Sequence, residues 1–99
     1  MSDADPLRFD PLLLSQVRLG VISVLVSRSN ATFTDLKELL GLTQGNLTVH
    51  LQKLEDADYV HVKKEFVKRK PRTTLTITAT GRAAFLRHLE QLNSIAGDS

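Results

Sequence analysis

The chain has 99 residues, of which 41% are hydrophobic, and its formal net charge is +2. A chain of this size buries enough surface for one compact core but hardly for two, so we expect a single domain. The sequence contains no Cys, which excludes disulfides, thiolate metal sites and thiol redox sensing.

The first residues of the chain are acidic, and no long apolar stretch follows them, so they do not have the pattern of a secretion signal. The longest apolar stretch, around residues 21–26, is interrupted by Ser23 and is too short to span a bilayer. We therefore expect a soluble, cytoplasmic protein. Residues 1–11 are expected to form a flexible N-terminal arm, residues 12–96 the folded domain and residues 97–99 a tail.

The first predicted helix covers residues 12–28, with Pro11 at its start, where a missing N–H costs nothing. Its apolar residues wrap around more than one side of the helix, and a single small core cannot cover all of them. We therefore expect part of this helix to contact another chain. Arg18 is expected to form an ion pair across the domain rather than to contact a phosphate.

Two short amphipathic helices are predicted next, after a loop at residues 29–31. Thr34 is expected to cap the first of them, and Gly41 is expected to end it. Thr43 is expected to cap the second, which covers residues 43–57. Its buried side is expected to consist of Leu47, Leu51 and Leu54.

The opposite side of the 43–57 helix is small, polar and weakly basic, which suits contact with the base edges of DNA. An ordinary solvated helix face has the same residue types, so this alternative stays open. His50 lies at the boundary of the buried side, where it either contacts a phosphate or positions the helix through a hydrogen bond. The residues expected at the DNA are Gly45, Asn46, Thr48, Val49, His50, Gln52 and Lys53.

After Tyr59 the pattern changes to period two, which predicts a β-hairpin with its tip at residues 68–72. Pro71 cannot donate to a strand ladder, so it is expected in the loop. Residues 60–73 contain six basic residues and one acidic residue, so the hairpin is a concentrated positive element. A solvated hairpin is the alternative interpretation. The side chains expected on phosphates or in the minor groove are Lys68, Arg69, Lys70 and Arg72.

The last predicted helix covers residues 81–95 and has an apolar stripe. This helix could simply cap its own core, but together with the first helix it suggests a two-fold interface built from both ends of the chain. A symmetric dimer would place two recognition helices about one turn of DNA apart, which suits a palindromic site. The expected interface residues are Leu12, Leu13, Val17, Val21, Phe85, Leu89, Leu92 and Ile95.

The order of these elements is the layout of a winged helix-turn-helix. The expected fold class is therefore α+β and mainly α, with a three-helix core, a two-stranded β-hairpin wing and a C-terminal helix. The 43–57 helix would occupy the major groove, and the 64–73 wing would lie on the backbone or in the minor groove.

Residues 35–43, followed by 47–54 and 59–60, resemble the winged helix-turn-helix of the MarR and ArsR transcription regulators. Within the second stretch, Thr48-x-His50-Leu51 resembles the Ser-x-His-Leu pattern of ArsR-type recognition helices. Val17-Arg18-Leu19 resembles the Arg-Leu pair in the first helix of these proteins. The match extends over most of residues 14–89 and is closest to small stand-alone winged-helix regulators that dimerise through their terminal helices.

This resemblance also implies which residues contact DNA. They include Gln44, which the helix pattern did not indicate. The resemblance places in the major groove Gln44, Gly45, Asn46, Thr48, Val49, Gln52 and Lys53. The cysteine motif of ArsR metal sensors is absent, as are the long extra helices around the MarR ligand pocket, so an effector remains unassigned.

No arrangement typical of a metal site or of a catalytic centre is recognisable in the sequence. His50, His61 and His88 lack the short spacing of zinc ligands, and no Ser, His and acid set suggests catalysis. We therefore expect no metal, no cofactor and no enzymatic activity. The expected function is a homodimeric, sequence-specific repressor that binds double-stranded DNA. A winged-helix protein–protein interaction module is the alternative, because fold alone does not determine function.

Overall fold

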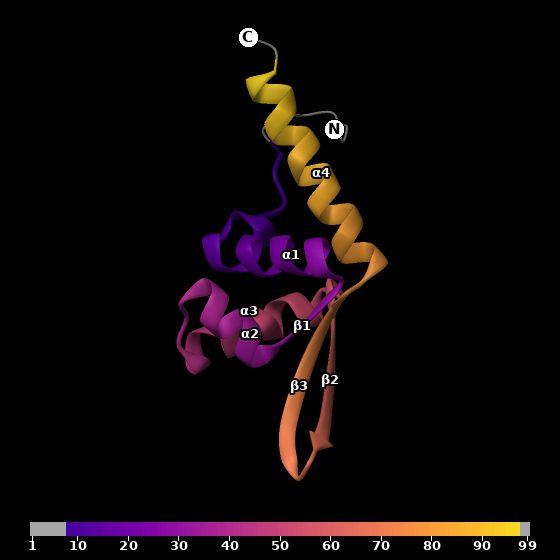
Figure 1. Cartoon of the computed structure of the whole chain (residues 1–99). Helices are drawn as coiled ribbons and strands as arrows, with labels where there is room; N and C mark the ends of the chain where they lie inside the picture. Colours follow the sequence, from indigo (N-terminus) through magenta and orange to yellow (C-terminus); the bar gives the residue numbers. More distant parts are fainter. Residues whose placement is uncertain (1–7, 98–99) are drawn as a thin grey trace.

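The structure, a computed structural model, describes residues 8–97 (Figure 1). Residues 1–7 of the expected arm and 98–99 of the expected tail lie outside the described residues. In chain order the elements are η1 (Pro11–Leu14), α1 (Gln16–Arg28), β1 (Asn30–Thr32), α2 (Phe33–Leu40), α3 (Gln44–Asp56), β2 (Val60–Val67), β3 (Lys70–Ile77) and α4 (Ala79–Ala96).

The helices and the sheet have the arrangement of a winged helix, so the expected fold class is confirmed. In Figure 1, α1 lies across α2 and α3, the hairpin of β2 and β3 extends away from the helices, and α4 extends in the opposite direction. The molecule is 54 Å along its longest axis and 24 and 21 Å along the other two. The hairpin and α4 therefore occupy opposite ends of an elongated molecule.

The sheet has one more strand than the expected two-stranded wing. Its order is β1-β3-β2 with antiparallel pairs, and Ala31 of β1 lies opposite Leu75 of β3. The prediction of a loop at residues 29–31 is therefore wrong for residues 30 and 31, which belong to β1. A three-residue strand is too short to show a period-two pattern, and it forms here because β3 supplies its partner 44 positions later in the chain.

The expected continuous helix over residues 12–28 is wrong at its start. Residues 11–14 form a 3₁₀ turn, and the helix begins only after Ser15, whose Oγ accepts a hydrogen bond from the Arg18 N–H at 3.2 Å. This break directs the Leu13 side chain into the core, where it is 1% exposed. Val21 of α1 is also buried, at 0% exposure. Both were expected at a dimer interface, and this is wrong, because a side chain enclosed by its own chain cannot contact a partner.

The ends of the two short helices were predicted with one error. Thr32, and not Thr34, caps α2: its Oγ1 accepts from the Asp35 N–H at 3.0 Å, and the Asp35 carboxylate accepts from the Thr32 N–H at 3.4 Å. This reciprocal pair is a capping box. Gly41, with φ of 64°, ends α2, and Thr43 caps α3 through a 3.2 Å bond from the Asn46 N–H, as expected.

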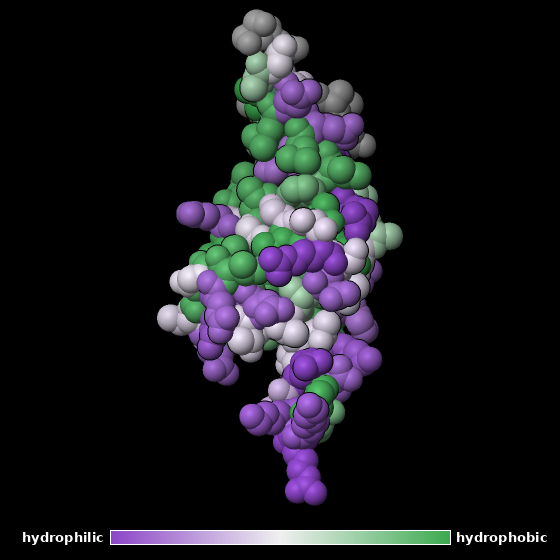
Figure 2. All heavy atoms as spheres, viewed as in Figure 1, coloured by the Kyte–Doolittle hydropathy of each residue, from purple (hydrophilic) through white to green (hydrophobic). Residues whose placement is uncertain are grey.

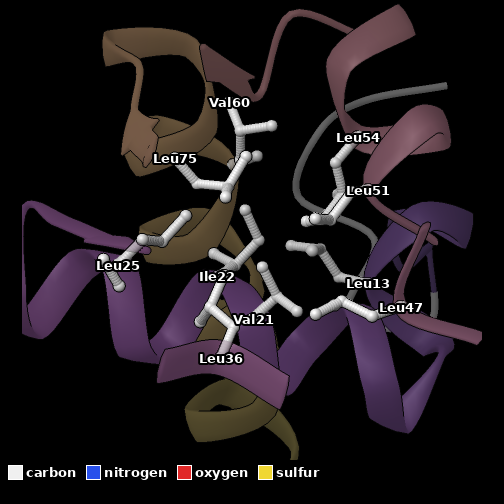
Figure 3. Close-up of a cluster of buried hydrophobic side chains, with 12 residues drawn as sticks. Leu13, Val21, Ile22, Leu25, Leu36, Leu47, Leu51, Leu54, Val60 and Leu75 are labelled. Atoms are coloured by element: carbon white, nitrogen blue, oxygen red, sulfur yellow. The ribbon is translucent and has the colours of Figure 1, made fainter. Parts of the chain in front are cut away.

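The core lies where α1, α2 and α3 meet the base of the sheet (Figure 3). The leucines of α3 that were expected inside are buried, with Leu47 and Leu54 at 0% and Leu51 at 6% exposure. They pack with residues of the other elements, including Leu13, Val21, Ile22, Leu36, Val60 and Leu75. The inward side of α3 is therefore confirmed.

Residues 8–10 of the expected flexible arm contact α4 and the residue before β2. The Phe9 ring lies 5.5 Å from the ring of the buried His88, and the Arg8 carbonyl accepts from the Gln91 amide at 2.6 Å. The Tyr59 hydroxyl donates to the Asp10 carboxylate. Burial and this carboxylate raise the pKa of Tyr59 to about 12. This part of the arm is thus packed on the domain.

Helix α4 begins at Ala79 with Thr78 as its cap, two residues before the predicted start. Gly81 in its first turn is buried and lies so close to the chain before β2 that a Cβ there would sit 2.2 Å from the Tyr59 carbonyl oxygen. We predict that Gly81→Ala lowers the free energy of unfolding by at least about 2 kcal/mol, because backbone must move. Urea denaturation measures this change.

Gly45 is the matched control, because a Cβ at this exposed helical position has no atom within 4 Å. Gly45→Ala is expected to leave stability unchanged or to raise it by up to about 1 kcal/mol through helix propensity. Equal stabilities of the two alanine variants would contradict the close packing of α4 against Tyr59.

Candidate nucleic-acid interface

The outward side of α3 presents a polar surface to solvent. The side chains expected at the DNA from this helix are all exposed except His50, which is half-buried. Val49 is 56% exposed and has no place in the core. Because the three buried leucines hold the opposite side of the helix, this surface has a defined direction.

Two of these side chains are already engaged within α3, and this limits what they can offer to DNA. The Thr48 hydroxyl donates to the Gln44 carbonyl at 2.8 Å, so in this geometry it can accept a hydrogen bond but not donate one. Gln52 Nε2 donates to Asp56 Oδ1 at 2.9 Å. One N–H and the carbonyl of the Gln52 amide remain free, which is the pair that a bidentate contact with adenine uses.

Arg18 connects the start of the domain to α3. Its Nε donates to the Leu12 carbonyl at 2.8 Å, and its Nη1 lies 3.0 Å from His50 Nδ1. A guanidinium has only donors, so Nδ1 accepts and the proton of the neutral ring is on Nε2. The ion pair expected for Arg18 is wrong, because a carbonyl and an imidazole, not a carboxylate, face this partly buried side chain. For His50 the contact favours the helix-positioning role.

The tip of the hairpin is a two-residue turn, Lys68-Arg69, in which both residues have positive φ, 53° and 68°. Such turns match the twist of the strands but normally contain Asn and Gly, because a Cβ makes the left-handed conformation costly. Lys68 and Arg69 thus occupy two positions where this type of turn normally has Asn or Gly. Turn geometry therefore does not explain why lysine and arginine stand at these two positions.

Pro71 lies in β3, so its expected place in the loop is wrong. It is opposite Phe66 in the ladder between β2 and β3. The short β1 pairs only with residues 74–76, so beyond them one edge of β3 has no neighbour. A proline without an N–H is tolerated at such an open edge.

A groove separates α3 from the hairpin. Its volume is about 260 Å³, and its wall includes Gln44, Thr48 and Gln52 from α3 and Lys64 and Thr73 from the strands. A second hollow of about 570 Å³ continues it between β3 and the start of α2, and is lined by Lys37, Pro71 and Arg72 among others. The polar face of α3 and the basic hairpin therefore border one continuous concave surface.

Two residues on the groove side of the hairpin lie within the predicted 64–73 wing but were not among the contact residues predicted from the sequence. Lys64 faces the same side as the core residue Val62, and Phe66, two positions further, is 78% exposed. The period-two pattern that identified the strand could have found both. The acidic Glu65 lies 3.8 Å from Lys63 on the other side, so it does not neutralise Lys64.

The far end of the molecule presents an apolar surface. Figure 2 shows hydrophobic atoms gathered over the upper part of the molecule, where α4 lies, whereas the hairpin is mainly hydrophilic. Of the expected interface residues, Leu89, Leu92 and Ile95 are between 44% and 47% exposed. The remaining three, apart from the two enclosed in the core, are half-buried: Leu12, Val17 and Phe85.

Within residues 8–97, every helix lacks the length or the apolar character that a membrane span requires. In the same part of the chain, no three His, Cys, Asp or Glu side chains gather closely enough to hold a metal ion.

Comparison with known proteins identifies the family. Residues 17–96 match the family described as the winged helix DNA-binding domain. The uncharacterized protein MJ0432 of Methanocaldococcus jannaschii is 38% identical over 78 residues, which cover 79% of this chain and 85% of that protein. The chain therefore belongs to the winged helix DNA-binding domain family.

Solved structures agree with this assignment. The structure of a transcriptional regulator homologue from Pyrococcus horikoshii OT3 is 34% identical, with a TM-score of 0.82, and the match covers 88% of this chain and 86% of that one. Other structural neighbours are transcription regulators of the MarR and ArsR families. The MarR-family regulator from Silicibacter pomeroyi, at 21% identity and a TM-score of 0.64, shares the fold over 84% of this chain and 55% of its own.

The pairing of Arg18 with His50 generates a prediction on pH. Burial, and then the charges of Arg18 and Lys53, lower the pKa of His50 below its usual 6.5. The folded protein thus binds this proton less well than the unfolded chain, so the contribution of His50 to stability is complete above 6.5 and is lost as the pH falls through the lowered pKa. Urea denaturation at neutral pH and at about pH 5 measures the loss.

Two variants isolate the contribution of this histidine. His50→Gln does not titrate and is expected to show a smaller loss of stability between the two pH values than the parent. Arg18→Met removes one of the two charges and is expected to raise the pKa of His50, followed by the ring resonances in NMR. A His50 pKa that does not change in Arg18→Met would contradict the contact.

Proposed function

We propose that this winged helix DNA-binding domain is a sequence-specific transcription regulator. In the proposal it binds double-stranded DNA as a homodimer, with α3 in the major groove and residues 64–73 on the adjacent backbone or in the minor groove. It acts as a repressor, because a small DNA-binding protein can block a promoter simply by occupying it.

The observation that carries the proposal is the common direction of two surfaces. The polar side of α3 and the cationic hairpin border the same concave groove, so one duplex can contact both. Phosphate contacts from the hairpin would supply affinity and orientation, whereas contacts from α3 would supply specificity.

Each part of the interface has its own proposed residues. Val49 offers a methyl-sized contact to thymine, and Gln52 offers the free half of its amide to a base edge. The other α3 residues proposed in or beside the major groove are Gln44, Gly45, Asn46, Thr48, His50 and Lys53. The hairpin residues proposed on phosphates or in the minor groove are Lys68, Arg69, Lys70 and Arg72.

The exposed apolar residues of α4 support the homodimer. An apolar surface of this kind on a small protein is typical of a contact with another protein, and a second copy provides an identical surface by symmetry. Two domains joined through α4 would carry two recognition helices, which suits a palindromic operator. The same surface also favours the second candidate function, a protein–protein interaction module.

Salt dependence distinguishes DNA binding from protein docking. We predict that the affinity for duplex DNA falls steeply with salt, and that replacing Lys68, Arg69, Lys70 and Arg72 together by Ala weakens binding to every sequence. The slope of log affinity against log salt should become shallower by about 0.9 for each phosphate that the variant no longer neutralises. Fluorescence anisotropy on a duplex selected from a random pool measures both quantities.

Control variants separate charge position from total charge. Arg87→Ala removes an exposed cation from α4 and is expected to leave the salt slope unchanged. Val49→Ala and Gln52→Ala should instead change the preference at particular base pairs, by about 1–3 kcal/mol for a true base contact. A quadruple variant that bound DNA as well as the parent would show that the hairpin is not the phosphate-binding element.

The homodimer is tested by sedimentation. We predict that the parent is a dimer at micromolar concentration and that Leu89→Glu combined with Leu92→Glu yields a folded monomer, because two charges cannot be buried in an apolar contact. Leu39→Glu, at a similarly exposed leucine of α2, is the control and should remain dimeric. A parent protein that sediments as a monomer would exclude this interface.

A further inference from the structure

Phe66 is the large hydrophobic side chain with the greatest exposure in the described part of the chain, at 78%. It is the second-to-last residue of β2, on a hairpin that is otherwise mainly hydrophilic (Figure 2). Leaving a phenylalanine in water forgoes the stabilisation that burial of its ring provides. An exposed ring at this position therefore needs an explanation other than folding.

The register of the hairpin places Phe66 on the groove side. The pairs Val62–Leu75, Lys64–Thr73 and Phe66–Pro71 follow one another on one face of the ladder, because alternate residues of a strand point to the same side. The first of these pairs belongs to the core, and the second lines the groove beside α3. Pro71 lines the hollow next to α2. Phe66 and Pro71 thus form an apolar pair on the same face of the hairpin as the groove-lining residues, nearer the tip.

A second copy of the chain does not fit this pair. The hairpin and the exposed leucines of α4 lie at opposite ends of the molecule (Figure 1), so a dimer formed through α4 leaves Phe66 uncovered. Cations lie on both sides of Phe66 along the chain: Lys64 two positions earlier in β2 and Lys68 in the turn. Lys70 and Arg72, the neighbours of Pro71, add charge on the other face of the ladder. Two such hairpins repel each other, whereas a polyanion is attracted.

The minor groove of DNA has the complementary chemistry. Its edges are rows of phosphates, which suit the flanking cations, and it is only about 6 Å wide in B-DNA. Proteins that bind there frequently insert apolar side chains between base pairs, which partly unstacks them and bends the duplex. An exposed phenylalanine ring next to a rigid proline on the neighbouring strand has the chemistry for such an insertion.

We propose that Phe66, with Pro71 opposite it in the hairpin, is an apolar wedge that enters the minor groove beside the base pairs contacted by α3 and bends the DNA. This inference rests on the proposed function, because it requires a bound duplex. Unstacking costs least at pyrimidine–purine steps, so Phe66 adds a preference for a TA or CA step at a position where the protein forms no base hydrogen bond. The bend is toward the major groove, by about 20–90°.

The test compares Phe66→Ala with the parent on the selected duplex, labelled at both ends for energy transfer. The variant is expected to bind about tenfold or more weakly, to lose most of the bend and to lose the preference for the flexible step. Its salt slope should equal that of the parent, because no cation has been removed. Phe66→Leu keeps an apolar side chain and is expected to retain most of the affinity and of the bend.

Leu39→Ala is the control, since Leu39 of α2 is another exposed large hydrophobic residue and lies outside the residues proposed at the DNA. It should bind and bend DNA as the parent does. If Phe66→Ala also binds and bends the duplex as the parent does, there is no wedge, although the proposed function stands. If its salt slope falls together with its affinity, Phe66 only holds the hairpin together, which equally overturns the proposal. A parent protein that binds no duplex refutes the proposed function itself.

Discussion

The inward packing of one side of α3 is the constraint on which the rest of the interface depends. Leu47, Leu51 and Leu54 are enclosed by α1, α2 and the base of the sheet (Figure 3). Because successive residues of a helix are rotated by about 100°, burying these leucines also sets the direction of every polar side chain on the opposite side. Burial of the leucines therefore orients the polar side of α3, although the polar residues themselves do not pack in the core. Arg18 adds a polar restraint through His50.

The hairpin combines charge with a conformation that its residues do not favour. Lys68 and Arg69 both occupy the left-handed region, at a cost of about 1 kcal/mol or more each relative to Gly. Pro71 is accommodated because β1 is short and leaves that edge of β3 open. The same open edge lets the hairpin extend beyond the helices, where its cations and Phe66 are accessible.

The two ends of the molecule differ in chemistry, which separates the partners that they can bind. The α4 end is apolar, whereas the hairpin end is cationic, and the long axis of 54 Å connects them. Repulsion between hairpins disfavours contact of two copies through that end. Arg8 and Phe9 pack on α4 through Gln91 and the ring of His88, so this segment covers part of the helix.

Local patterns in the sequence determined much of the fold and the main parts of the interface. The leucine spacing of α3, the caps at Gly41 and Thr43, the period-two hairpin and its positive charge depend on residues close together in the chain, and these features are present in the structure. The residues proposed on α3 are exposed for the same reason. Some local signals were misinterpreted, such as the capping box that begins at Thr32.

Only the tertiary structure decided the features that join distant segments. The pairing of β1 with β3 and the bond between Arg18 and His50 connect residues 32 to 46 positions apart. The burial of Leu13 and the direction of Phe66 follow from where the 3₁₀ turn and the hairpin lie relative to the helices. A residue pattern specifies which side of an element is apolar, but burial depends on what other elements cover, and that arrangement exists only once the chain has folded.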